Sequence, residues 1–164
     1  MKMIRKATVD DLSSIHQLSQ VVKQHMLSQG LNQWVGDYPT IDVFTQDLQL
    51  SGLYVFTENN QIIASISILP ENDPPYQALV WDSSEALVIH RILVNPKHQG
   101  KGIGKQLFAY AIMQMMNGYQ SLKVDTHPDN IKMQALIKQM GFSYKGYLSS
   151  INRLAYEKSK SSML

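Results

Sequence analysis

The feature that most constrains the fold is a stretch near the middle of the chain, residues 87–107, with the sequence LVIHRILVNPKHQGKGIGKQL. It begins with an apolar run typical of a buried strand, which Asn95-Pro96 ends because proline has no N–H to donate. Three glycines within five residues follow and lead into apolar residues at helical spacing. The sequence therefore predicts a strand, a glycine-rich turn and the start of a helix.

A glycine-rich turn at the start of a helix is suited to binding a phosphate. The first N–H groups of a helix have no partner within it, and the helix dipole favours an anion there. Glycine lets a phosphate approach the main chain closely. Lys97, Lys101 and Lys105 add positive charge around the turn. The alternative is a turn that binds no ligand.

The spacing of the glycines excludes two familiar phosphate loops. A P-loop needs four residues between its first glycine and Gly-Lys, but only three separate Gly100 from Gly104, and Gln106 stands where Ser or Thr would bind magnesium. The dinucleotide fingerprint needs a glycine where Lys105 stands. The pattern that remains is Gln-x-x-Gly-x-Gly directly after a strand.

Length and composition bound the class of protein. A chain of 164 residues predicts a single domain, which we place at 1–158, followed by a frayed polar tail at 159–164. The net charge of +2 does not favour a nucleic-acid partner, and the absence of cysteine excludes disulfides, thiolate metal sites and a covalent acyl-cysteine intermediate. The histidines are scattered, so we expect no metal site. No segment is apolar enough to be a signal peptide or a membrane span, so we expect no membrane partner and a cytoplasmic location.

Periodicity predicts the order of the remaining elements. It predicts a strand at 3–7, helices at 12–29 and 40–51, a hairpin at 53–69 that turns at Asn59-Asn60, a helix at 102–116, a strand at 121–126, a helix at 130–140 and strands at 142–147 and 153–158. The helix between strands 87–94 and 121–126 predicts that these two strands are parallel. Met113, Met115 and Met116 are expected to fill the core.

Two stretches give the chain a family resemblance. The Gln-x-x-Gly-x-Gly pattern resembles the acetyl-CoA pyrophosphate loop of the GCN5-related N-acetyltransferase (GNAT) family, and DTHPDNIKMQALIKQMGFSYKGY resembles the final coenzyme segment of that family. The resemblance covers essentially the whole chain. It implies an α/β (α+β) fold of the acyl-CoA N-acyltransferase type. Such a fold has a mixed, mostly antiparallel central sheet of about six or seven strands, about four helices, and a splay between the two central parallel strands.

The resemblance also implies cofactor-binding residues for acetyl-CoA. The backbone of Ile92, Leu93 and Val94 would pair with the pantetheine arm as a neighbouring strand does. The main-chain amides of the loop would hold the pyrophosphate. These amides belong to Gln99, Gly100, Lys101, Gly102, Ile103, Gly104 and Lys105. Asn130 would hydrogen-bond the pantetheine or phosphate region.

The activity implied by the resemblance is N-acetyl transfer. The acetyl group of acetyl-CoA (coenzyme A) would move directly to a primary amine of a small molecule or peptide, through a ternary complex and a tetrahedral intermediate. Two alternatives stay open: a coenzyme-A-binding module without turnover, and transfer of another acyl group. Monomer and homodimer are both compatible with the sequence.

Catalytic candidates lie on and near the glycine-preceding strand. His90 is the best candidate for a general base, because an unperturbed pKa near 6.5 suits the removal of a proton from an amine. The alternative is a histidine packed structurally in the strand. Glu85, at the start of the strand, could act through water. Ile137 occupies the position at which many relatives have a tyrosine that protonates the leaving thiolate. Either Tyr144, Tyr147 or water replaces that tyrosine, or the step needs little help because a thiolate is already a fair leaving group.

Acceptor-binding candidates lie in two loops. Trp34 and Tyr38, between the first two helices, could line a substrate pocket or simply cover the sheet. The densest acidic region of the chain follows the hairpin. It is either a solvated loop or a favourable entrance for a cationic amine, and it contains Glu71, Asp73, Asp82 and Glu85.

Overall fold

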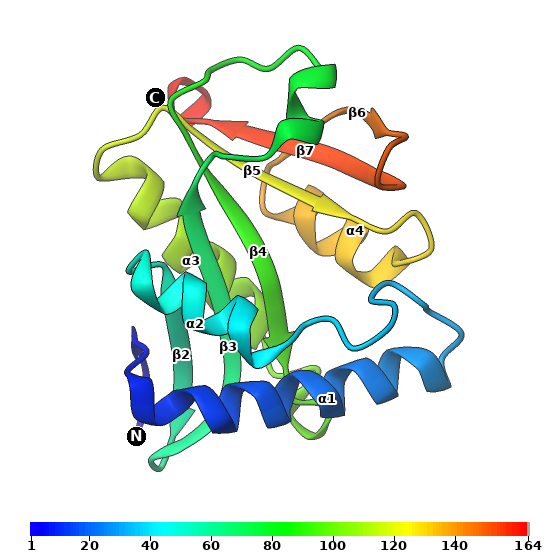
Figure 1. Cartoon of the computed structure of the whole chain (residues 1–164). Helices are drawn as coiled ribbons and strands as arrows, with labels where there is room; N and C mark the ends of the chain where they lie inside the picture. Colours follow the sequence, from blue (N-terminus) through cyan, green and yellow to red (C-terminus); the bar gives the residue numbers. More distant parts are fainter. Residues whose placement is uncertain (164) are drawn as a thin grey trace. The chain divides into compact units, whose positions relative to one another are not determined.

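The computed structural model describes residues 1–163 (Figure 1). Within that range the strands are β1 (Lys2–Lys6), β2 (Leu53–Glu58), β3 (Gln61–Pro70), β4 (Ala86–Val94), β5 (Ser121–Thr126), β6 (Ser143–Leu148) and β7 (Arg153–Ser159). The α-helices are α1 (Leu12–Ser28), α2 (Ile41–Gln49), α3 (Ile103–Met116) and α4 (Ile131–Gln139). The predicted order of elements is confirmed.

The strands form one mixed sheet in the order β1-β2-β3-β4-β5-β7-β6. β1 with β2, β2 with β3, β5 with β7, and β6 with β7 are antiparallel, whereas β4 and β5 are parallel. The parallel direction follows from the crossover through α3, as the sequence predicts. The predicted fold class, a mostly antiparallel mixed sheet with four helices, is therefore confirmed for the described residues.

The parallel pairing of β4 with β5 covers three residue pairs, from Ala86 with Ser121 to Val88 with Lys123. β4 itself continues to Val94. The predicted splay would begin beyond the last of these pairs, and it stays a prediction.

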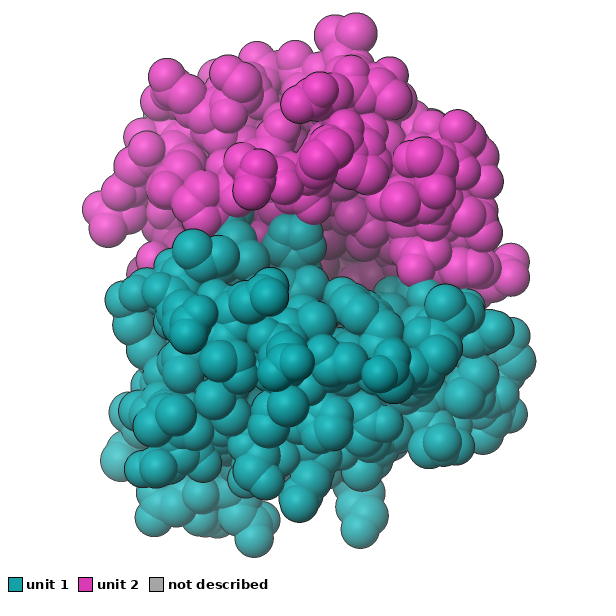
Figure 2. Space-filling view, viewed as in Figure 1, with its two compact units in different colours: residues 1–69, 90–107 teal, residues 70–89, 108–164 magenta. Residues whose placement is uncertain are grey.

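The chain divides into two compact units, which Figure 2 colours separately. Unit 1 comprises residues 1–69 and 90–107, and unit 2 comprises residues 70–89 and 108–164. The single domain expected at 1–158 stays a prediction. Of the expected tail, Ser159 belongs to β7, residues 160–163 form a short 3₁₀ helix, and Leu164 lies outside the described residues.

Unit 1 packs its first two helices on one side of the first three strands. α1 and α2 both lie in front of β2 and β3 in Figure 1. Ile15, Phe44 and Val55 are fully buried in the core beneath them. Local signals fix the elements: the Thr40 side chain accepts a hydrogen bond from the Val43 amide at the start of α2, as expected for an N-cap. The hairpin turns at Asn59-Asn60.

Unit 2 has its own buried groups between β5–β7 and the 3₁₀ segment Pro74–Ala78. Tyr76 is buried and stacks on Trp81, with ring centroids 5.0 Å apart. On α3, Met115 is fully buried, but Met113 is 68% exposed. The expectation that Met113 fills the core is wrong, because its side chain faces solvent at this position of α3.

No helix within residues 1–163 combines the length and the apolar composition that crossing a membrane requires.

Candidate active site

The glycine loop lies in unit 1 between a 3₁₀ turn, Pro96–His98, and the start of α3. Gly100 and Gly102 have φ values of +80° and +76°, a region that glycine enters at no steric cost. A side chain built at either position would meet nothing within 4 Å. Both glycines are exposed. The backbone is therefore both turned and uncovered at this point.

The helix that follows leaves its first amides available to a ligand. The Gln106 N–H donates to the Gly102 carbonyl at 3.2 Å, and the N–H groups before it have no partner within the helix. Lys97, Lys101 and Lys105 are exposed around the loop. Uncovered amides, a helix N-terminus and three cations together suit a phosphate.

β4 bends just before the residues predicted to pair with the pantetheine arm. Arg91 has φ +46° in the middle of the strand, and such a conformation costs a non-glycine residue about 1–3 kcal/mol. Beyond it Leu93 is fully buried, while Ile92 and Val94 are half-buried. The regular alternation that would put His90 on the same face as Ile92 is therefore interrupted. His90 itself is half-buried.

The side chain of Arg91 forms a buried ion pair with Asp47 of α2. Its Nε donates to Asp47 Oδ2 at 2.9 Å, and its Nη2 lies 2.7 Å from both carboxylate oxygens. Asp47 is 3% exposed and also accepts from Ser67 Oγ at 2.6 Å. Burial lowers the pKa of Arg91, but Tyr38 and Asp47 raise it more, so the pKa lies above its ordinary value and the side chain stays charged.

This pair could not be predicted from the sequence. The only signal for Arg91 was a charged residue inside an apolar strand, and the sequence did not indicate its partner.

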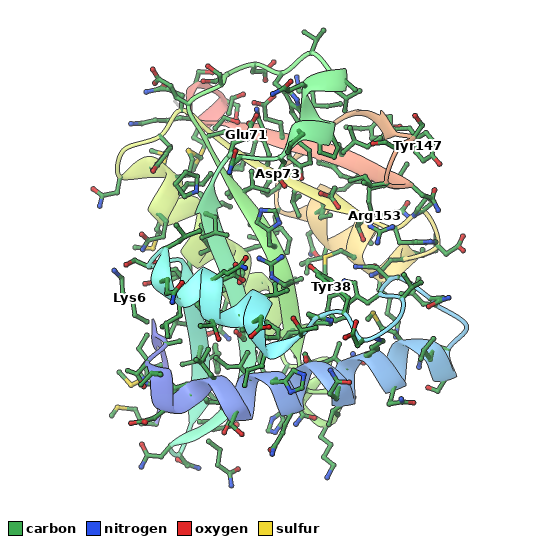
Figure 3. All side chains as sticks on the ribbon, viewed as in Figure 1. Lys6, Tyr38, Glu71, Asp73, Tyr147 and Arg153 are labelled. Carbon is green, nitrogen blue, oxygen red and sulfur yellow. The ribbon has the colours of Figure 1, made fainter. Side chains whose placement is uncertain are left out.

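Tyr38 is held at both ends on the loop between α1 and α2, where Figure 3 labels it. Its hydroxyl oxygen accepts from Arg91 Nη1 at 3.0 Å. Its carbonyl accepts from the buried Lys23 Nζ at 2.8 Å, and Lys23 also donates to the Gly36 carbonyl. Trp34 packs edge-on to Tyr38 and is 8% exposed within the core. Little of the Trp34 ring is left to contact a substrate, and its substrate-binding role stays a prediction.

In unit 2, Asn130 and Ile137 belong to α4. Asn130 caps the helix, with its Oδ1 accepting from the Met133 amide at 3.1 Å. Ile137 is fully buried. The two tyrosines expected to replace a donor at Ile137 lie on β6: Tyr144 is 54% exposed, and Tyr147 is 48% exposed and donates to Asn152 Oδ1 at 2.7 Å. The roles of all four residues stay predictions.

The acidic region of unit 2 is largely occupied by internal ion pairs. Glu71, labelled with Asp73 in Figure 3, pairs with the buried Lys123. Asp82 accepts from Lys145 Nζ at 2.7 Å and from Ser159 Oγ at 2.6 Å. Glu85 is exposed at the start of β4. These contacts favour a structural role for Glu71 and Asp82 over an entrance for a cationic amine.

The hydroxyl of Tyr76 lies in the same unit and donates to Asp125 Oδ2 at 2.6 Å. Burial, and then the negative charge of Asp125, raise the pKa of Tyr76 well above its ordinary value. Tyr76 therefore stays protonated at neutral pH.

Comparison with known proteins gives a consistent result. A sequence model of the acetyltransferase (GNAT) family matches residues 19–142. The Bacillus subtilis (strain 168) protein described as the uncharacterized N-acetyltransferase YesJ is 22% identical, over 85% of this chain and 81% of its own length.

Solved structures share the fold. A GNAT-family acetyltransferase of Streptococcus agalactiae 2603 superposes with a TM-score of 0.86 at 24% identity, covering 97% of this chain and 95% of its own. The Salmonella typhimurium protein yncA, solved with its cofactor acetyl-CoA, has a TM-score of 0.69 at 16% identity, covering 96% of this chain and 91% of its own.

Proposed function

The chain belongs to the GNAT family of acetyltransferases, and on that premise we propose that it moves the acetyl group of acetyl-CoA to a primary amine of a small molecule or peptide. The observation that carries the proposal is the uncovered glycine loop at the start of α3, with Gly100 and Gly102 at positive φ and open space where side chains would stand. Acetyl-CoA supplies the activated acetyl group, as a thioester, together with the diphosphate that such a loop can hold.

The residues of the loop fit a diphosphate. Amide N–H groups from Gly100 to Lys105 donate hydrogen bonds, whereas the Gln99 N–H already donates to the Pro96 carbonyl at 3.3 Å. The three surrounding lysines balance the charge. Hydrogen bonds to a charged group contribute about 1.5–3 kcal/mol each, so a handful is enough for a tightly held cosubstrate. The backbone of Ile92, Leu93 and Val94 is proposed to pair with the pantetheine arm, and Asn130 to add a hydrogen bond.

The acceptor must lose its proton before it can attack. A lysine-type amine, with a pKa near 10.4, costs about 4–5 kcal/mol to deprotonate at pH 7, whereas an α-amine with a pKa near 7.7–8 costs about 1 kcal/mol. We assign the base to His90, which is half-buried directly before the bend of β4. Glu85 is exposed five positions earlier along the chain and could contribute only through water.

Charge that develops on the acetyl oxygen needs a fixed donor. A backbone N–H near Leu93 or Val94 is the proposed donor, because a main-chain donor in a rigid strand needs no rearrangement during the reaction. The leaving thiolate receives no proton from Ile137, which has no donor atom. Tyr144 is the proposed replacement, since this residue is 54% exposed, whereas the hydroxyl of Tyr147 already bonds Asn152.

Ile137 is also the observation that favours a second candidate function. A family member without a proton donor at this position could bind coenzyme A without turnover. The two functions differ in a single measurable quantity, the release of free thiol.

The test is an amine-panel assay. The protein is saturated with acetyl-CoA and mixed with amines that span α-amines, lysine-type amines and polyamines, and free thiol is followed with time. Thiol release that depends on one amine class supports the acetyltransferase. Binding of acetyl-CoA without release above the blank for any amine refutes turnover and leaves the binding module.

A further inference from the structure

We propose that Arg91 is a positioning residue, which fixes the backbone of β4 and the hydroxyl of Tyr38 together. Residues 90–94 of β4 and the loop that carries Tyr38 both belong to unit 1. The catalytic consequence of this coupling rests on the proposed acetyl transfer, whereas the coupling itself can be tested without any turnover.

The bend of β4 is held by the side-chain contacts of Arg91. A left-handed conformation at a non-glycine residue persists only where its surroundings fix it. The Arg91 fork is fixed by the Asp47 carboxylate through its Nε and Nη2. Asp47 is fixed in turn by Ser67 and by its place on α2. The planar guanidinium makes these bonds in one orientation only.

The bend of β4 determines the backbone direction of the three residues that follow it. Ile92, Leu93 and Val94 follow it directly, and on their far side the Asn95 N–H donates to the Ile63 carbonyl at 2.9 Å. The three residues are therefore held between two fixed points. Their amide directions, which the proposed reaction uses, are set by the conformation of Arg91.

The hydroxyl of Tyr38 is oriented by the same guanidinium. Its oxygen accepts from the Arg91 cation, so its own O–H proton must point away from the guanidinium. The hydroxyl is therefore presented as a donor, and the buried Lys23 holds the carbonyl of the same residue. The Arg91 guanidinium thus bonds both Asp47, which fixes the bend of β4, and the hydroxyl of Tyr38. It therefore links the backbone of β4 to the loop that carries Tyr38.

The experiment uses Arg91→Lys in the full chain. Lysine keeps the positive charge beside Asp47 but cannot donate in three fixed directions. The matched control is Arg5→Lys, because Arg5 makes a similar bidentate pair with Asp11, at 2.7 and 3.1 Å, elsewhere in unit 1.

Hydrogen exchange is measured by mass spectrometry in three segments: 92–95, 36–40 and, as a reference, β2. We expect Arg91→Lys to accelerate exchange about tenfold in both 92–95 and 36–40, with β2 unchanged, and Arg5→Lys to change neither segment. Unchanged exchange in either segment overturns the proposal, and so does equal acceleration in β2, which would mean general loosening.

Tyr38→Phe, which removes one oxygen, keeps the test decisive if Arg91→Lys does not fold. It should accelerate exchange in 36–40 and, because Arg91 loses an anchor, detectably in 92–95. Absence of any effect in 92–95 contradicts the coupling.

Kinetics separate this proposal from the proposed function. Where the wild type releases thiol, Arg91→Lys should lower kcat about tenfold with KM for acetyl-CoA changed less than about twofold. The combined variant with Tyr38→Phe should be no worse than Arg91→Lys alone. A kcat for Arg91→Lys equal to that of the wild type contradicts positioning. A wild type that releases no thiol refutes the proposed function, while the exchange data still decide the role of Arg91.

Discussion

The glycine loop and the Arg91–Asp47 pair lie in the same unit and are built in opposite ways. The loop is exposed main chain, with open space around Gly100 and Gly102. The pair is made of side chains with little exposure, 12% for Arg91 and 4% for Asp47. Main-chain binding needs glycines at fixed spacing and is therefore visible in the sequence. A side-chain network can join any two suitable residues that the fold brings together, so it leaves no local pattern.

The difference predicts that the pair carries stability and the loop carries binding. Asp47→Ala leaves the Arg91 charge buried and unpaired, which should lower the free energy of unfolding by about 3–5 kcal/mol. The measurement is urea denaturation. Asp42→Ala, at an exposed acid on the same helix, is the control and should change it by less than about 1 kcal/mol. An Asp47→Ala loss as small as the control's would remove the distinction between the two regions.

His90 lies directly before the bend that the Arg91–Asp47 pair holds. Substitution of His90 therefore tests whether this region supports acetyl transfer as well as stability. His90→Ala should lower kcat/KM about a hundredfold with a lysine-type amine at neutral pH and abolish the acidic limb of the pH–rate profile. An α-amine should be affected less, because its proton is lost more easily. A profile that keeps its shape in the variant would exclude His90 as the base.

The lysines should contribute to the loop only through charge. Lys101→Gln removes one exposed cation and should weaken acetyl-CoA binding by about 1 kcal/mol, with a smaller dependence on salt than in the wild type. Titration at two ionic strengths measures both effects. Equal salt dependence in the two proteins would mean that Lys101 does not face the phosphates.

A second ion pair of unit 1, Arg5–Asp11, has the more exposed arginine: the Arg5 side chain is 37% exposed, against 12% for Arg91. The hydrogen bonds from Arg5 lower the pKa of Asp11. Burial raises it and the Thr8 amide lowers it, so the pKa lies below its ordinary value. A carboxylate with a depressed pKa stabilises the fold above the pKa of the unfolded chain, near 3.9, and this stability is lost as the pH falls through the folded-state pKa. The stability difference between wild type and Asp11→Asn should therefore shrink below about pH 4.

The effect of Asp11→Asn at pH 7 should be about 1 kcal/mol, well below that of Asp47→Ala. An equal effect at the two sites would show that burial is not what distinguishes them. Urea denaturation at pH 7 and pH 3 supplies both numbers.

Much of the fold could be predicted because its signals are local. The strand predicted at 121–126 coincides with β5, and the turn predicted at Asn59-Asn60 has φ values of 52° and 67°, which asparagine tolerates better than most residues. Glycine spacing likewise located the loop. These features depend on a few neighbouring residues, so periodicity and turn chemistry suffice.

The rest could not be predicted because it depends on distant partners. Asp47 and Arg91 are 44 positions apart, and nothing about an arginine indicates a positive φ. The exposure of Met113 depends on which side of α3 packs against the rest of the protein. The sequence of α3 does not indicate that side, because nearly all of its residues are apolar. Even for Tyr38, the sequence indicated an aromatic loop but not the guanidinium that orients its hydroxyl.

The central claim is that bare amides of the glycine loop hold the diphosphate of acetyl-CoA, and calorimetric titration of a matched pair tests it directly. Gly102→Asp and Gly102→Asn add equal bulk directly before α3, and both residue types tolerate positive φ. Asp also suits a helix N-terminus, so the fold should be kept. We predict saturable binding to the wild type, weaker binding to Gly102→Asn, and a loss of about a hundredfold or more for Gly102→Asp. Equal affinity for all three proteins, or no saturation of the wild type, would contradict the account.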